Sequence, residues 1–500
     1  MDQKGVRYTK LALMFLLIVA VGAFVVPFSA VQVLGDVGEQ IADLPQAQYE
    51  TVPVIGYEAE LEDMLTEETV AIYVPLSDFS AASTYVQTIS LSRYETVHEG
   101  AVKEILRSVR SATGNLARPI NLYLLSFVET DNIACVNLSG DTDISDMELF
   151  AIAYCLTNTL TEFGDIAYVS ILMDDMAVSF DGVPMGVMTY FNNSLQIEYW
   201  QLSNRAKALH EQSDIAASFS LPISLYFGAP SSLVVGEIRE IPCYADTQKM
   251  IPSVIEELTK GPRDTGKAQR LFPPDAKLNS WEVSEDEDGA WSLRLEISGA
   301  VSSYFARNKV EPRVAVASVA LSLFDFYPKL QSVSVYFTDG LQSEYTGITR
   351  PGCELLLGST ITMYFPPESG GNAIIPVERT VPSYMMSMPD LLLDEMTKTP
   401  VGIEVGGIFP PNTDASDIRS IKQQDDVAYV NITERFLTEL RAVDAAQEKR
   451  IVYCMVNTII NNKSAKKVVF TVDGYSCDNV PGRINLSELL YYNPGIVRRH

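Results

Sequence analysis

Histidine is nearly absent from this chain. Its 500 residues contain three, His98, His210 and His500, which are far apart and show no metal-ligand spacing. A zinc site or a catalytic triad is therefore not expected. The phosphate-binding pattern GxxxxGK[ST] and the nucleophile pattern GxSxG are missing as well. We expect solvent-exposed histidines, and the sequence predicts no enzyme, no catalytic, cofactor or metal residues and no cofactor.

A basic surface is the second absence. The chain has 37 Lys and Arg against 64 Asp and Glu, a net charge of -27, and no basic block outside its extreme ends. A nucleic-acid partner would need a cationic face that neutralises phosphates, so this class of partner is excluded. The acidic surface favours solubility but indicates no particular partner.

One long apolar run lies near the N-terminus. Basic residues precede the stretch 11–31, which reaches the length needed to span a bilayer. Cleavage after Ala30 would put Phe28 where a small residue is required, and no cysteine follows that could anchor a lipoprotein. We predict an uncleaved signal anchor with the rest of the chain outside the cytoplasm. A cleaved signal peptide, giving a secreted protein, is the alternative.

Three similar strand-like stretches indicate an internal repeat: VAIYVPLSD (70–78), ISLYFGAP (223–230) and ITMYFPP (361–367). In the middle copy, alternating and helical apolar patterns follow in the order β-β-α-β-β-α-β. The third copy repeats this order, and the first copy is more diverged. The predicted fold is α/β (α+β), three tandem small domains of this kind behind an N-terminal transmembrane anchor. Apolar positions that should be buried alike in the three copies are Leu106, Ile255 and Leu393, and Ile152, Val316 and Ile451.

The sequence divides into segments on this basis. We expect an anchor (1–31), an acidic linker (32–67), copy 1 (68–185), a linker with a possible helix (186–219), copy 2 (220–345), a linker (346–357), copy 3 (358–480) and a tail (481–500).

The ordered motifs of the copies resemble the GerM domain, the sporulation and germination module of spore-forming bacteria. The carriers are "YFP", "ELTKGP", "FPP", "VNLS" or "VNIT", "NTLTEF" and "VDG". Copy 1 departs from the pattern, because it lacks "GP" and has Asp174 and Asp175 where "DG" belongs. The resemblance implies extracytoplasmic, membrane-attached proteins of the envelope between mother cell and forespore. It also implies small α/β domains similar to the ring-building domains of secretion machines, not known as enzymes.

Six cysteines include no C-x-x-C pair. Cys155 and Cys454 fall at one position of the repeat, where copy 2 has Val319. A position that accepts cysteine or valine is typical of a buried small apolar site, where a free thiol packs like a hydrophobic group. The other four cysteines could pair, but the sequence does not select partners.

Acidic clusters give no convincing site. "GDTDISDMEL" begins like a calcium loop but has Asp146 instead of the glycine and Ile152 instead of the bidentate glutamate. The aspartates that close the last strands, Asp175, Asp339 and Asp473, are typical of turns.

The function predicted is structural. We expect a single-pass protein of the cell membrane, with its body outside the cytoplasm, that acts in sporulation, germination or envelope assembly by protein–protein association. Its partners would be envelope or sporulation proteins, with oligomeric assembly left open, and no small-molecule substrate is indicated. The alternative is a secreted module that binds cell-wall glycan or peptide through exposed aromatics, for which Trp281 and Trp291 are the only candidates. A cell-wall hydrolase is the third possibility.

Overall fold

The computed structural model describes most of the chain from Thr66 onward. The described residues are 66–76, 79–92, 95–111, 119–141, 143–211, 220–244, 246–339, 345–386, 388, 391–424, 426–462, 465–477, 480–481 and 483–498. The predicted anchor, 1–31, lies outside them. Within these ranges, no helix combines the length and apolarity that a membrane crossing requires. The three copies belong to one compact unit, Met64–His500.

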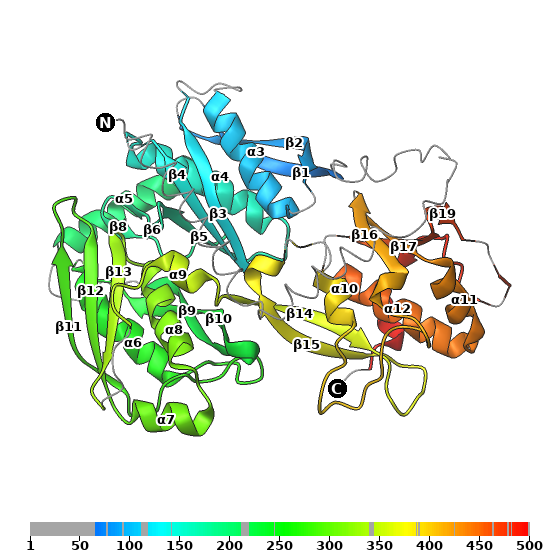
Figure 1. The fold of residues 1–500 in the computed structure, drawn as a ribbon. Coiled ribbons are helices and arrows are strands. Elements are labelled where there is room, and N and C mark those ends of the chain that lie inside the picture. Colours follow the sequence, from blue (N-terminus) through cyan, green and yellow to red (C-terminus); the bar gives the residue numbers. More distant parts are fainter. Residues whose placement is uncertain are drawn as a thin grey trace, which may run out of the picture. The chain divides into compact units, whose positions relative to one another are not determined.

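Copy 1 folds in the predicted order of elements (Figure 1). Its helix α4 starts at a capping box, in which Ser145 and Glu148 each bind the other's backbone N–H, a strong start signal. The elements are β1 (Thr66–Pro75), β2 (Ala82–Leu91), α3 (Val97–Ser111), β3 (Leu122–Thr130), β4 (Ile133–Gly140), α4 (Asp146–Thr161) and β5 (Tyr168–Met173). Short strands and a helix follow: β6 (Met176–Ala177), β7 (Ser179–Phe180), β8 (Val183–Pro184) and α5 (Leu195–Glu211).

Copy 2 repeats this order with one extra helix, α7. Gly261, with a φ of 81°, ends α6, a backbone conformation that glycine adopts most readily. The elements are β9 (Ser220–Ala229), β10 (Leu233–Pro242), α6 (Ile251–Lys260), β11 (Lys277–Glu285), β12 (Trp291–Ser298), α7 (Val301–Asn308), α8 (Pro312–Phe324) and β13 (Leu330–Phe337), followed by α9 (Arg350–Glu354).

Copy 3 also follows the order and also has an extra helix, α11. Its first helix, α10, is short. The elements are β14 (Gly358–Phe365), β15 (Ile375–Pro382), α10 (Leu391–Met396), β16 (Ile418–Gln424), β17 (Val427–Ile432), α11 (Glu434–Ala442), α12 (Ala445–Asn462), β18 (Lys467–Val472), β19 (Tyr475–Ser476), β20 (Leu490–Tyr491) and the 3-10 turn η5 (Pro494–Ile496).

The sheets of the three copies have the same topology. Each copy has an antiparallel hairpin, β1–β2, β9–β10 or β14–β15, and a separate mixed sheet. In the mixed sheet the second strand pairs antiparallel with the first and parallel with the third, and short antiparallel strands extend the sheet in copies 1 and 3. A β-bulge interrupts the first pair at the same place in every copy, and the residues that resume the pairing are Ser126, Ser280 and Ser420. The shared bulge fixes a residue-by-residue correspondence among the copies.

Helices cover one face of each mixed sheet, and most predicted core positions are buried there. Ile152, Val316 and Ile451 are all buried, as predicted, and so are Leu106 and Ile255. The expectation for Leu393 is wrong, because this side chain is only half-buried. In the short α10 the residues that enter the core are Leu391, Leu392 and Met396. One hydrophobic core runs through copies 1 and 2, and copy 3 has its own.

The segments that follow each copy complete it. Met188 pairs with Val169 of β5, Ile348 with Val333 of β13, and β20 with β18. We call residues 187–193, 348–352 and 490–495 the closing segments of copies 1, 2 and 3.

Candidate functional site

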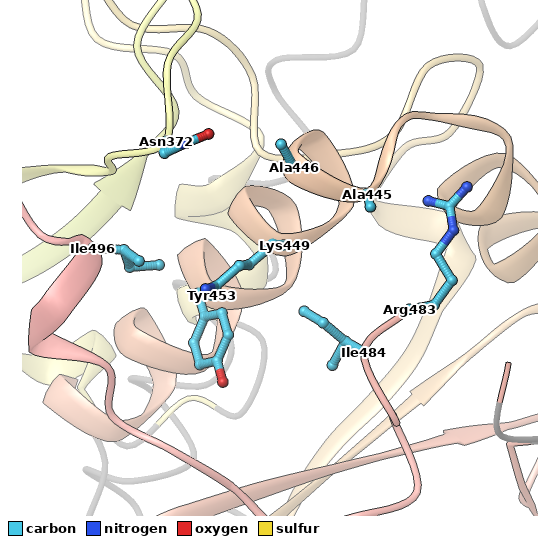
Figure 2. Close-up of a pocket in the computed structure, with 8 residues that line it drawn as sticks. All are labelled: Asn372, Ala445, Ala446, Lys449, Tyr453, Arg483, Ile484 and Ile496. Carbon is cyan, nitrogen blue, oxygen red and sulfur yellow. The ribbon is translucent and has the colours of Figure 1, made fainter. Parts of the chain in front are cut away.

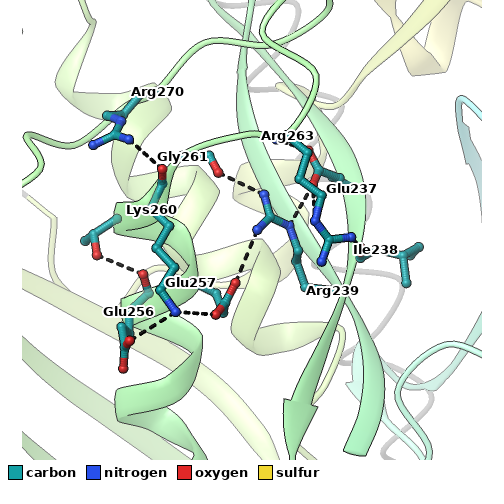
Figure 3. A network of polar contacts seen from close by, with 10 residues as sticks. Glu237, Ile238, Arg239, Glu256, Glu257, Lys260, Gly261, Arg263 and Arg270 are labelled. Carbon is teal, nitrogen blue, oxygen red and sulfur yellow. Dashed lines mark hydrogen bonds and ion pairs between the residues drawn. The ribbon is translucent and has the colours of Figure 1, made fainter.

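In copy 2, an arginine of strand β10 binds the C-terminal end of the first helix, α6, and so connects this helix to the β9–β10 hairpin (Figure 3). Arg239 of β10 donates from Nη2 to the carbonyl oxygen of Gly261 at 2.8 Å. It also pairs with Glu237 at 2.6 Å and with Glu257 at 3.2 Å, while its guanidinium lies 5.5 Å from the ring centre of Phe227. The cation thus satisfies a carbonyl at the negative end of α6, where positive charge is favourable.

Copy 3 builds the same arrangement with Arg379 of β15. This side chain binds Glu395 at 2.9 Å and the carbonyl oxygen of Lys398, and lies 5.2 Å from the ring centre of Phe365. In copy 1 the corresponding residues are Gln87 and Glu104, joined at 2.5 Å. Because two copies share the arrangement and the third keeps a neutral version, its role is to hold strand and helix together.

A tyrosine of the first strand marks a second recurring network. The backbone N–H groups of Tyr73, Tyr226 and Tyr364 donate to helix hydroxyls 2.9–3.0 Å away. These hydroxyls belong to Thr159, Ser322 and Thr458. The tyrosine hydroxyls contact Glu162, Asp325 and Asn461, which stand at one position of the second helix. The network ties the first strand to the second helix in every copy.

The closing segments bind this network in two ways. In copies 1 and 3 a buried asparagine of the helix makes paired amide bonds to the closing backbone: Asn158 binds Phe191 at 2.8 and 3.2 Å, and Asn457 binds Asn493 at 2.9 and 3.2 Å. Copy 2 has Leu321 at this helix position and Pro351 opposite, whose ring nitrogen cannot donate. The asparagine is therefore replaced where no N–H needs a partner.

Copy 2 uses Arg350 where the other copies have Tyr190 and Tyr492. Arg350 is fully buried and pairs with Asp325, which also accepts the Tyr226 hydroxyl bond. A buried ion pair is stable only if both charges are compensated, and here Glu354 adds a second bond to Arg350 at 3.1 Å. Burial raises the pKa of the Glu354 carboxyl, against the effect of Arg350.

Arg350 also reaches into copy 1. Its Nη2 donates to Sγ of Cys135 on β4 at 3.1 Å. Burial raises the pKa of this thiol to about 12, although Arg350 lowers it. Gly236 of β10 lies against the same sheet, since a Cβ there would come within 2.9 Å of Ile133 Cδ1. Ser359 adds a bond of 2.5 Å to the Glu129 carbonyl oxygen. The sheet of copy 1 is thus covered by copy 2 and by the start of copy 3.

We define the outer sheet face as the side of each mixed sheet that points away from the helices. By strand register its central positions are Cys135 in copy 1, Arg294 in copy 2 and Tyr429 in copy 3. In copy 1 this face is buried around Cys135, Leu172 and Ala177. In copies 2 and 3 the central residues are exposed. One surface of the repeat is therefore engaged within the chain and two are open.

The expectation of a solvent-exposed histidine is wrong for His98. Its side chain is buried, with Nδ1 2.8 Å from Glu129 and Nε2 3.2 Å from Asp165. Burial opposes protonation, but the bonds to the two carboxylates outweigh it and raise the pKa of His98 to about 10. The ring is a structural cation, which explains how α3 can bury it. The side chains of His210 and His500 lie outside the described residues.

The cysteines behave as packing groups. All six are buried, and no disulfide joins them. Cys155, Cys454 and Val319 are each fully buried, so the prediction of a shared small apolar site is confirmed. Burial raises the pKa of the Cys155 and Cys454 thiols well above the ordinary value.

The acidic turns form no common site. By strand register, the position of copy 1 that is equivalent to Asp473 of copy 3 is Asp174, not Asp175. This corrects the predicted equivalence. Asp175 binds Asn137 at 2.7 Å and Asp339 binds the Ser302 N–H at 2.6 Å. Over the described ranges, no three His, Cys, Asp or Glu side chains are grouped to hold a metal ion.

The two tryptophans do not lie on the outer sheet face, although Trp281 is 42% exposed. Trp291 binds Glu285 through its indole N–H at 3.2 Å and packs against the core. Trp281 pairs with Leu295, so both lie on the helix-covered side of the sheet.

The sequence analysis did not predict the arginine, tyrosine and closing-segment networks. Their signal is recurrence: Arg239 with Arg379, and the tyrosine before each phenylalanine or valine, stand at equivalent positions. Polar residues inside strands give no periodic pattern, so only a comparison among copies could have found them.

A protein-family model matches most of the chain. The family model described as "Germane: Sporulation and spore germination" matches residues 71–179, 224–341 and 362–478, more than half of the chain. No curated protein matches.

Solved structures give more distant likenesses. The chain is similar to the tandem GerMN domains of the sporulation protein GerM from Bacillus subtilis, at 17% identity over 58% of this chain and 98% of that one, with a TM-score of 0.23. It is also similar to the first GerMN domain of that protein, at 16% identity over 26% and 95% of the two chains, with a TM-score of 0.20. A putative lipoprotein from Clostridium perfringens matches at 24% identity over 23% and 80%, with a TM-score of 0.16. On the strength of the three family-model matches, the chain belongs to the Germane family of sporulation and spore germination.

Proposed function

We propose that this chain is a membrane-anchored, extracytoplasmic protein that acts in sporulation or germination by binding other envelope proteins. The family supports a sporulation- or germination-related role, and it is not known as enzymatic. The apolar run at 11–31 supports the anchor and the outward orientation. The association mechanism rests on the outer sheet face.

The observation that carries this proposal is the different use of one surface. In copy 1 the outer sheet face already binds the hairpin of copy 2 and the side chain of Arg350. In copy 2 the same face presents Ser292 and Arg294, the latter lying 4.4 Å from the ring centre of Tyr336. In copy 3 it presents Tyr429 beside Lys422 and Val469. Because the outer sheet face binds a neighbouring domain in copy 1, the same face is a good candidate for binding other proteins in copies 2 and 3, where it is open.

The partners we propose are envelope or sporulation proteins. The open faces combine tyrosine and arginine with short polar side chains, which suits protein recognition. The net charge of -27 argues against nucleic acid.

The test is cross-linking and pull-down of the tagged full chain from sporulating cells. We expect envelope proteins to be captured by the wild type and to be lost from Arg294→Glu and Tyr429→Asp variants. Tyr475→Asp, on the 79% exposed tyrosine of β19, is the matched control and should keep them. Deleting 1–31 should release the chain from the membrane fraction. Capture that is equal for all variants would reject the outer sheet face as the binding surface.

A further inference from the structure

A cavity of about 510 Å³ opens beside the first turns of α12 in copy 3 (Figure 2). One helix contributes four lining side chains, and two later segments of the same copy contribute most of the rest. The lining residues are Asn372, Ala445, Ala446, Lys449, Tyr453, Arg483, Ile484 and Ile496. We call this cavity the α12 groove. It combines an apolar floor with cations and a phenol, the kind of lining that binding sites show.

Copy 1 shows what fills the corresponding place. The equivalent asparagines Asn158 and Asn457 align α4 with α12, so Phe150 stands where copy 3 has Lys449. The centre of the Phe150 ring lies 5.4–5.7 Å from the ring centres of Phe180, Phe191 and Tyr199. Of these, Tyr199 belongs to α5. A helix carrying an aromatic side chain therefore covers this surface in copy 1.

The tyrosines at the next turn make the same point. Tyr154 of copy 1 stacks on Phe191 at 5.2 Å and donates its hydroxyl to the Asn193 carbonyl oxygen at 2.9 Å. Tyr453 of copy 3 lines the groove instead, and its hydroxyl has no hydrogen-bond partner among the residues that the structure describes. The α12 groove thus lacks the aromatic contacts that the closing segment and α5 make to the equivalent helix in copy 1.

The charge of the groove differs from that of the chain. Lys449 is exposed and forms no ion pair with any described residue. The nearby acids are occupied: Glu448 is fully buried between Arg441 and Arg483, and Asp444 caps α12 through bonds of 2.8 and 2.9 Å. No carboxylate is among the lining residues, although the chain carries a net charge of -27. An occupant should therefore bring negative charge.

We propose that the α12 groove binds an amphipathic helix of a partner protein that carries an aromatic side chain next to Asp or Glu. The aromatic ring would pack beside the stem of Lys449, as Tyr199 packs on Phe150 in copy 1, and the carboxylates would pair with the Lys449 ammonium, because Arg483 is already bonded to Glu448. Helix-in-groove recognition is a common mode of this kind. The proposal rests on the proposed association function and names a second surface for it.

The probe is a labelled peptide with the α5 sequence, Leu195–Glu211, in which Arg205→Glu and Lys207→Glu supply the acidic side chains. Binding to the purified full chain in mild detergent is followed by fluorescence anisotropy. We expect saturable binding that Lys449→Glu weakens at least tenfold. Ala446→Trp, which fills the groove without changing its charge, should weaken binding as strongly. Lys466→Glu, on an exposed lysine of the same copy, is the matched control and should bind normally.

Two results would overturn the proposal. One is equal peptide binding, or none, in the wild type, Lys449→Glu and Ala446→Trp. The other is occupancy by a small anion alone: benzoate that shifts the Tyr453 resonances while the peptide does not bind would show a small-molecule pocket. A chain that captures envelope proteins in cells but binds no peptide keeps the proposed function and rejects only the groove.

Discussion

The chain builds the same sheet three times and uses its outer face in two ways. Strand β4 of copy 1 is buried on both sides, whereas β12 and β17 alternate between buried and more exposed residues. The central position of that face is Cys135 in copy 1, Arg294 in copy 2 and Tyr429 in copy 3. The inward-facing apolar residues are alike, so the fold does not depend on the outer face. The outer residues decide whether a domain packs on its neighbour or stays open.

The largest expected effect comes from the buried Arg350–Asp325 ion pair of copy 2, whose arginine also contacts Cys135 of copy 1. Arg350→Ala leaves Asp325 buried without its countercharge, so the free energy of unfolding should fall by about 3–5 kcal/mol. A less buried arginine, Arg379 of β15 in copy 3, serves for comparison: Arg379→Ala should cost about 1–3 kcal/mol, because that side chain is 15% exposed and retains access to water. Urea unfolding of both variants measures the difference. A smaller loss for Arg350→Ala than for Arg379→Ala would remove the basis for a tight junction.

The apolar part of the covered face should matter next. Leu172→Ala in copy 1 removes a fully buried side chain and should lower the free energy of unfolding by about 2–5 kcal/mol. Thr471→Ala, at the equivalent position of copy 3, should change it by no more than about 1 kcal/mol, because this side chain is half-buried and loses only a long bond of 3.3 Å to Asn431. Equal losses in the same denaturation assay would mean that the two faces are equally buried.

Copy 1 also contains a buried charged group, His98. The pKa of His98 is raised to about 10, so the stability that its carboxylate bonds supply is fully present below about pH 6.5 and is lost as pH rises toward 10. From pH 7 to 8.5 the wild type should lose about 2 kcal/mol of unfolding free energy. His98→Gln cannot be protonated and should lack this slope. Parallel pH profiles for the two proteins would show that the ring is neutral.

The smallest effect is expected at the position that the copies share. Cys155→Val and Cys454→Val copy the natural residue Val319 of copy 2, so each should leave the free energy of unfolding within about 1.5 kcal/mol of the wild type. Thermal and urea unfolding check this. A larger loss would mean that the thiols make a contact that valine cannot replace.

Sequence patterns predicted the order of elements and most of the core. The reason is that the same spacing of apolar residues, typical of strands and helices, occurs in all three copies. Ile152, Val316 and Ile451 are buried as that period requires. The prediction that Leu393 is buried was wrong because α10 is shorter than α6, the equivalent helix of copy 2. The prediction that His98 is exposed was wrong because its two carboxylate partners, Glu129 and Asp165, come from distant parts of the chain. No local sequence pattern indicates such contacts.

The sites were harder to predict than the fold. Arg239 and Arg379 stand on strands where a charged residue normally indicates exposure, and their helix-end carbonyl partners are invisible in a sequence. The covered face of copy 1 differs from the open faces at single residues such as Leu172. A burial that depends on the packing of a second copy cannot be read from the period of one strand.

Thiol labelling at the three equivalent positions tests the central claim most directly. Native Cys135 is compared with cysteines introduced by Arg294→Cys and Tyr429→Cys, and the background is low because all six natural cysteines are buried. We expect rapid labelling of the two introduced thiols in the folded protein. Cys135 should react only on unfolding, since it is 6% exposed and its pKa is raised to about 12. Labelling of Cys135 in the native chain as fast as the other two would show that the face of copy 1 is open like theirs, and would contradict the account.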